Sequence, residues 1–310
     1  MRQYNNRIVT FILIFYMDYQ KELREFKPSH DYFIGIDSDG CVFDSMEVKQ
    51  KEFFIPNALK YFNLFPVSKA VRETWEFVNL YSLHRGGNRF VAMLKVFDLL
   101  AQRKEIIESG YILPDLQPLR DWVDKETKLG NASLRKYYED NKDKRLEPVL
   151  KWSETVNREI AGWLRNIPPF LHAKTAIEKI SAFADIVVIS QTPLEALEHE
   201  WLENDLKKYV KMIAAQEHGT KAEHLALAAR SKYREDRILM IGDAKGDLDA
   251  AKKNNIFFYP IIPGEENFSW KIFLEEGLDR FVNGKFAGTY EDMLINTFNN
   301  SLPETPPWVS

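Results

Sequence analysis

Five short apolar segments constrain the fold of this chain more than any other feature of its sequence. They are residues 31–37, 185–190, 209–215, 237–243 and 256–262. Each is rich in β-branched or aromatic side chains, which is typical of buried strands. Amphipathic segments with helical spacing accompany them, at residues 173–184, 193–206, 221–232 and 245–255. Strands that alternate with helices predict an α/β fold with a Rossmann-like parallel sheet and helices on both faces.

A long helical stretch separates the first of these strands from the second. Residues 68–84, 89–103 and 147–164 are amphipathic with helical periodicity. We expect residues 108–121 to form a loop, and residues 134–145 to be a charged, solvated segment. The sequence therefore predicts a helical domain inserted into the α/β domain.

These patterns give the following domain boundaries. We expect an N-terminal extension at 1–30, a catalytic α/β core at 31–45 and 170–295, a helical cap at 46–169 and an irregular tail at 296–310.

Composition limits the partners and the compartment. The 310 residues carry a net charge of −4, which provides no general attraction to nucleic acid or to an anionic membrane. Cys41 is the single cysteine, so no disulfide can form within the chain, and we expect a cytoplasmic location. The apolar run 8–17 is too short to span a bilayer, but it leaves secretion or membrane anchoring as an alternative. Whether Met1 or Met17 is the true start stays open.

Polar residues follow several of the predicted strands where each strand ends. They are Asp37 and Asp39 after the first strand, Ser190 after the second, Lys221 after the third, and Asp243 and Asp247 after the fourth. The run "DSDG" by itself is typical of a turn or a calcium loop. Because the carboxyl ends of parallel strands meet at one edge of a sheet, the whole set indicates one site there.

The set resembles the motifs of the haloacid dehalogenase (HAD) superfamily of phosphotransferases. The matching stretches are "DSDGCVFDS" (37–45), "VVIS" (187–190), Lys221 and "GDAKGD" (242–247), in the order of the family. The resemblance covers about 31–45 and 170–262. It implies that the insertion at 46–169 is a C1-type cap, although it is longer than the usual compact one.

The resemblance also implies a role for each motif residue. Asp37 would be the nucleophile that forms an aspartyl-phosphate. Asp39 would act as general acid and then as general base, which requires surroundings that raise its pKa. Ser190 and Lys221 would bind the phosphoryl group. Thr192 is a rival to Ser190 as the hydroxyl donor.

Magnesium is the cofactor that the resemblance implies, because a hard cation held by carboxylates can neutralise a phosphate. Its ligands would be the carboxylates of Asp37 and Asp243 and the main-chain carbonyl of Asp39, with Asp247 in the outer shell. Asp44 would be the hinge into the cap, and Cys41 would serve packing.

One segment of the predicted cap could select the substrate. "LHRGGNRF" (83–90) places His84, Arg85 and Arg89 around a Gly-Gly turn, and two arginines beside flexible backbone could bind an anionic substrate. A plain turn between two helices with exposed charges is the alternative.

We therefore expect a Mg²⁺-dependent phosphatase that acts on a small phosphorylated metabolite, as a monomer or dimer. A phosphomutase or a phosphonatase of the same superfamily is an alternative, the latter requiring a cap lysine that can form a Schiff base. A non-enzymatic binding or regulatory protein with this fold is a further alternative. Neither nucleic acid nor a membrane is an expected partner, and the sequence does not indicate the leaving group.

Overall fold

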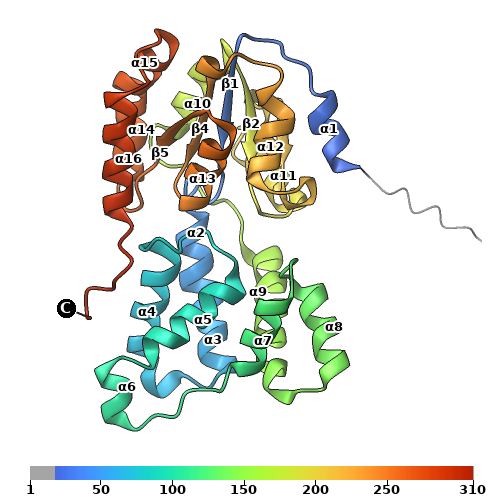
Figure 1. Ribbon diagram of the computed structural model, residues 1–310, viewed down its shortest axis with the longest axis vertical. Coiled ribbons are helices and arrows are strands. Elements are labelled where there is room, and N and C mark those ends of the chain that lie inside the picture. Colours follow the sequence, from blue (N-terminus) through green and yellow to red (C-terminus); the bar gives the residue numbers. More distant parts are fainter. Residues whose placement is uncertain (1–17, 310) are drawn as a thin grey trace, which may run out of the picture.

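The structure, a computed structural model, describes residues 18–309 and contains one five-stranded parallel sheet (Figure 1). The strands are β1 (Tyr32–Ile36), β2 (Ala184–Ile189), β3 (Met212–Ala214), β4 (Ile238–Gly242) and β5 (Phe257–Pro260). Their order across the sheet is β3-β2-β1-β4-β5, which places β1 at the centre. Ile34 pairs with Ile186 on one side and with Leu239 on the other. The five predicted strands are confirmed.

Helices cover both faces of this sheet, as the sequence predicts. They are α1 (Tyr19–Glu25), α10 (Ala173–Ser181), α11 (Leu194–Glu203), α12 (Lys221–Leu225), α13 (Lys245–Asn254), α14 (Glu266–Ile272), α15 (Leu278–Val282) and α16 (Thr289–Ser301). Successive strand residues point to opposite faces. Ile34 therefore packs in the cluster that contains α10, α11, α14 and α15 residues. Phe33 packs in the other cluster, with residues of α1, α12, α13 and α16.

The segment between β1 and β2 is a helical insert with its own hydrophobic core. Its helices are α2 (Ser45–Val48), the π-helix η1 (Lys49–Phe54), α3 (Ile55–Tyr61), α4 (Ser68–Leu80), α5 (Arg89–Leu100), α6 (Lys104–Ser109), α7 (Gln117–Lys125), α8 (Asn131–Asn141) and α9 (Glu147–Trp163). Trp75, Trp122 and Trp152 are fully buried in this core. Figure 1 shows the helical insert as a separate layer facing one edge of the sheet.

Two predictions about local structure are wrong in part. The loop expected at 108–121 ends early, because α7 begins at Gln117 with Pro118 in its first turn, and Leu119 and Trp122 are buried. The irregular tail expected from residue 296 is helical as far as Ser301, since Phe298 on α16 packs into the sheet core. In both places, burial of apolar side chains stabilises helical turns that the short apolar pattern of the sequence does not indicate.

The C-terminal segment after α16 crosses from the sheet layer to the helical insert (Figure 1). The Trp308 ring lies 5.4 Å from the ring of Phe77 on α4. The Arg103 guanidinium lies over Trp308 at 4.6 Å from the ring centroid. This segment therefore joins the two layers at a third place, besides the two chain connections on either side of the insert.

Within residues 18–309, no helix combines the length and apolar character needed to cross a membrane. The apolar run 8–17 lies outside the described residues.

Candidate active site

Asp37 lies at the carboxyl end of the central strand and is almost fully buried. Its backbone N–H donates to the Ile241 carbonyl of β4 at 3.0 Å, which continues the sheet pairing by one residue. The Ser38 N–H donates to Asp37 Oδ1 at 2.8 Å, and Lys221 Nζ lies 2.7 Å from Asp37 Oδ2. Burial raises the pKa of Asp37 to about 7, although the Lys221 charge opposes this shift.

Asp243 and Asp247 complete a buried acidic cluster with Asp37. Ligand atoms of these three carboxylates lie within 4.8 Å of one another. Burial raises the pKa of Asp243 to about 7 and also raises the pKa of Asp247. Among the described residues, Asp243 Oδ1 is buried and has no hydrogen-bond partner. Oxygen ligands and one unpaired buried oxygen fit a hard divalent cation such as Mg²⁺.

Lys221 connects the members of this cluster. Its Nζ lies 2.7 Å from both Asp37 Oδ2 and Asp247 Oδ1. These two carboxylates raise the pKa of Lys221 against the opposing effect of burial, so the ammonium is charged. The lysine begins α12, where the Thr220 hydroxyl accepts from the Glu223 N–H and holds the first turn.

Asp39 faces a different set of partners from Asp37. Lys49 Nζ donates to both Asp39 oxygens at 2.6 and 2.7 Å, Thr192 Oγ1 donates to Oδ2 at 2.7 Å, and the Ser45 hydroxyl donates to Oδ1. Burial would raise the pKa of Asp39, but Lys49 and the hydroxyl donors outweigh it and lower the pKa. The expected raised pKa is therefore wrong for this arrangement. The Asp39 side chain is also not a member of the acidic cluster.

Ser190 and Thr192 both follow β2, and their hydroxyls make different hydrogen bonds. Ser190 is 2% exposed, its N–H donates to the Ala214 carbonyl at 2.9 Å, and its Oγ accepts from the Thr192 N–H at 3.2 Å. The Thr192 hydroxyl is engaged with Asp39. Ser190 thus keeps its hydroxyl proton available at the end of β2, whereas Thr192 holds the neighbouring carboxylate.

Sequence reasoning missed Lys49 and Glu200. Glu200 on α11 accepts from the Ser38 hydroxyl at 3.1 Å. Burial first, and the Asp39 charge second, raise the pKa of Glu200 to about 7 against the effect of Lys49. Lys49 is the first residue of η1, and Glu200 lies in α11, the helix that follows β2 along the chain. No spacing rule in the sequence indicates that these residues meet Asp39 and Ser38.

Arg85 of the helical insert reaches the acidic cluster. Its Nε donates to Asp243 Oδ2 at 2.7 Å and its Nη1 donates to the Leu80 carbonyl at 2.8 Å, and the residue is 3% exposed. Gly40 has a φ of +79°, and a Cβ there would lie 2.4 Å from Arg85 Nη2 and 2.6 Å from Asp243 Oδ2. Only glycine therefore allows the turn after Asp39 to pass beneath this ion pair.

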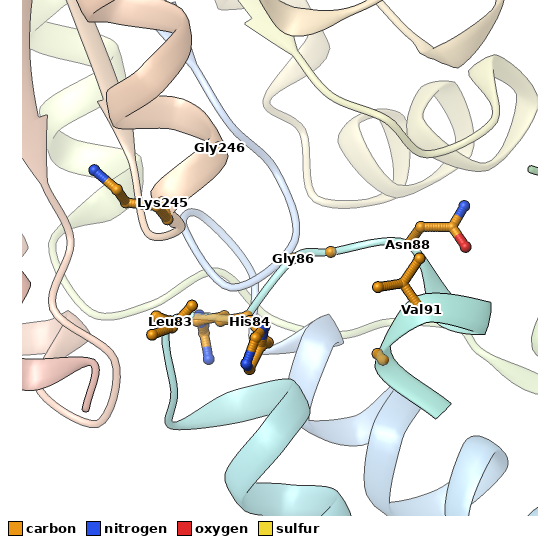
Figure 2. Close-up of a pocket in the computed structure, with 10 residues that line it drawn as sticks. Leu83, His84, Gly86, Asn88, Val91, Lys245 and Gly246 are labelled. Atoms are coloured by element: carbon orange, nitrogen blue, oxygen red, sulfur yellow. The ribbon is translucent and has the colours of Figure 1, made fainter. Parts of the chain in front are cut away.

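Arg89 and His84 have other surroundings than the Asp243 carboxylate that Arg85 contacts. Arg89 Nη1 donates to Ser153 Oγ at 3.2 Å and to Asn157 Oδ1 at 2.6 Å, both on α9. Burial lowers the pKa of Arg89 to about 10. His84 lines a cavity of about 270 Å³, and burial lowers its pKa. In Figure 2 this cavity has His84 and Val91 on the side of the insert, and Lys245 and Gly246 on the side of α13.

Asp44 and Cys41 lie in the connection from β1 to the insert. Asp44 precedes α2, and burial together with Glu47 raises its pKa to about 6. Cys41 is fully buried, and burial raises the pKa of its thiol. Its side chain is part of the core cluster beneath the sheet, in line with the predicted packing role.

Comparisons with known proteins find solved structures but no family model and no curated relative that match this chain. A HAD-like hydrolase from Xanthomonas campestris is 10% identical with a TM-score of 0.41, covering 84% of this chain and 97% of its own. A HAD-like hydrolase from Streptococcus pneumoniae is 13% identical with a TM-score of 0.39, covering 77% and 90%. A predicted phosphatase from Clostridium acetobutylicum is 17% identical with a TM-score of 0.37, covering 75% and 85%. The first two carry the name of the superfamily whose motifs this sequence resembles.

Proposed function

We propose that this protein is a HAD-type, Mg²⁺-dependent phosphatase that hydrolyses a small phosphorylated metabolite through an aspartyl-phosphate. The meeting of Asp37, Asp243, Asp247 and Lys221 at one edge of the sheet is the observation that carries the proposal. A nucleophilic carboxylate, a cation-binding carboxylate pair and a fixed ammonium are the groups that transfer of an anionic phosphoryl group requires.

Mg²⁺ held by Asp37, Asp243, Asp247 and the Asp39 main-chain carbonyl would neutralise the charge of the phosphoryl oxygens. An Asp37 oxygen attacks phosphorus, the bond to the leaving oxygen breaks, and Lys221 and the Ser190 hydroxyl hold the phosphoryl oxygens. Asp39 donates a proton to the leaving oxygen, and then takes one from the water that hydrolyses the aspartyl-phosphate. For this the Asp39 carboxyl turns away from Lys49 and Thr192.

Two observations bear on the alternatives within the superfamily. Asp39 raises the pKa of Lys49 against the effect of burial, so its amine is charged and unsuited to the Schiff base of a phosphonatase. The Arg85–Asp243 contact brings the insert, as the proposed cap, directly onto the site. Since a phosphomutase needs a cap that excludes water, this contact favours phosphomutase as the second candidate.

A phosphate-release assay over a panel of phosphorylated metabolites, with and without Mg²⁺, tests the proposal. Asp37→Asn is expected to abolish the Mg²⁺-dependent release. Asp249→Asn, an exposed change on α13, is the matched control and is expected to retain it. Substantial release by Asp37→Asn would contradict the nucleophile. Transfer of phosphate between two sugar hydroxyls in place of release would favour the mutase.

A further inference from the structure

We propose that Lys49 binds a second anionic group on the leaving-group side of the substrate, and so selects phosphoesters whose leaving group is itself an anion. The inference rests on the proposed phosphatase function. The natural substrate would carry a carboxylate or a second phosphate a few bonds from the ester that is cleaved.

The contact between Lys49 and Asp39 carries the inference. Lys49 Nζ donates to both oxygens of Asp39 at 2.6 and 2.7 Å, and the two side chains are only 15% and 14% exposed. The hydroxyls of Ser45 and Thr192 donate to the same two oxygens. A carboxylate that accepts from donors on both oxygens has no proton to give to a leaving group.

Asp39 must therefore leave Lys49 before it can reach the leaving oxygen. Its departure removes two short charge-assisted hydrogen bonds from a largely buried ammonium, and an unpaired buried charge is costly. The other carboxyls that face Lys49 are Glu200 and Asp37. Glu200 already accepts from Ser38, and Asp37 is paired with Lys221, so neither replaces both lost bonds.

An anion on the substrate can replace them. Asp37, Ser190 and Lys221, which take the phosphoryl group, all belong to the α/β part of the chain that contains the sheet. Lys49, in contrast, begins η1 in the helical insert. A phosphoryl group held by the first three residues thus directs its leaving group toward the insert. An anionic leaving group pairs with Lys49 and so releases Asp39. A neutral leaving group cannot do so, and Asp39 stays bound to Lys49.

Three esters with the same three-carbon chain test this selection. Propyl phosphate has a neutral leaving group, 3-phosphooxypropanoate has a carboxylate, and propane-1,3-diol bisphosphate has a second phosphate. For the unmodified protein we expect kcat/KM at least about tenfold higher for an anionic ester than for propyl phosphate. The carboxylate and bisphosphate arms distinguish the two sources of the second charge.

Lys49→Met is expected to change the two classes of ester in opposite directions. It should lower kcat/KM for the anionic esters about tenfold or more, because their partner is lost. It should raise kcat/KM for propyl phosphate, because Lys49 no longer holds Asp39. Lys49→Arg should retain part of the selectivity. Lys51→Met is the matched control, because Lys51 lies in the same π-helix η1 but pairs with Glu47. An equal loss on all three esters, or no change on any, would overturn the inference.

A binding measurement separates this inference from the phosphatase proposal itself. In the Asp37→Asn background, which should not turn over, calorimetry compares 3-phosphooxypropanoate and the bisphosphate with propyl phosphate. We expect tighter binding of an anionic ester that Lys49→Met abolishes. If this preference is found but no ester is hydrolysed by the unmodified protein, the phosphatase proposal fails and the role of Lys49 stands. If Lys49→Met does not alter binding, the role of Lys49 fails whatever the activity.

Discussion

Arg85 of the helical insert and Asp243 at the end of β4 form an ion pair of 2.7 Å in which the two side chains are 2% and 0% exposed. The pair places a positive charge from the insert on a carboxylate of the predicted cation site. Arg85 was predicted to contact the substrate, and that role stays a prediction. Because Arg85 contacts Asp243, a substitution of Arg85 is expected to alter the predicted cation site whichever substrate is used.

Replacement of Arg85 should strengthen cation binding and weaken the fold without the cation. In Arg85→Gln we expect Mg²⁺ to bind more tightly, since a positive charge beside Asp243 is gone. The metal-free protein should lose about 3 kcal/mol of stability, because a buried carboxylate loses its partner. Calorimetric Mg²⁺ titration and denaturant unfolding measure the two effects. Arg89→Gln, whose partners lie on α9, is the control, and an unchanged Mg²⁺ affinity in Arg85→Gln would contradict the prediction.

Cation binding should depend on pH around neutrality. The pKa values of Asp37 and Asp243 rise from 3.8 to about 7, so the folded metal-free protein holds protons there that the unfolded chain has lost. These two groups therefore lower the metal-free stability as the pH rises from about 4 through about 7. Because Mg²⁺ competes with the same protons, the rise in Tm that Mg²⁺ produces should grow between about pH 6 and about pH 8.

Thermal unfolding with and without Mg²⁺ across this range checks the prediction. Asp37→Asn removes one titrating group and should flatten the dependence. A Mg²⁺-induced shift in Tm that is constant across the range would show that these carboxyls do not titrate near neutrality.

Asp185 provides a stability prediction away from the active site. Its buried side chain accepts from the Ser29 hydroxyl at 2.5 Å, from the Ser29 N–H at 2.7 Å and from the Tyr233 hydroxyl at 2.7 Å. These hydrogen bonds, aided by His30, outweigh burial and lower its pKa to about 2. Its contribution is thus present above about pH 4 and is lost as the pH falls toward about 2.

Asp185→Asn is expected to cost about 2 kcal/mol of unfolding free energy at neutral pH, because the charge that these donors favour is removed. Denaturant unfolding at neutral pH and near pH 3 measures the loss, which should shrink at the lower pH. Phosphate release should not change in the folded variant. A loss of the same size at both pH values would mean that the charge of Asp185 is not what stabilises this position.

Trp308 should stabilise the contact between the C-terminal segment and the insert. Trp308→Ala removes its packing against Phe77 and Arg103, and we expect a loss of about 1–2 kcal/mol for this half-buried ring. We also expect faster proteolysis of the segment after Ser301. Trp163→Ala, whose ring is 78% exposed, is the matched control. Equal stability and equal proteolysis of both variants would show that the segment is not held by Trp308.

The sequence by itself determined the five strands, the helices on both faces and the helical insert. The spacing of apolar residues along the chain is a local property, and it indicates both the type of element and the side of it that becomes buried. It also indicated that Asp37, Ser190, Lys221 and Asp243 would meet, because parallel strands end at one edge of a sheet. Tertiary structure alone decided which charged side chains pair with one another in the site. Lys49 and Arg85 belong to the helical insert, and Glu200 lies on α11, which covers the sheet, so their meeting with Ser38, Asp39 and Asp243 depends on how the insert sits against the sheet domain. The lowered pKa of Asp39 follows from one such placement, because the strength of a charge pair depends on distances of a few ångströms that no spacing along the chain encodes.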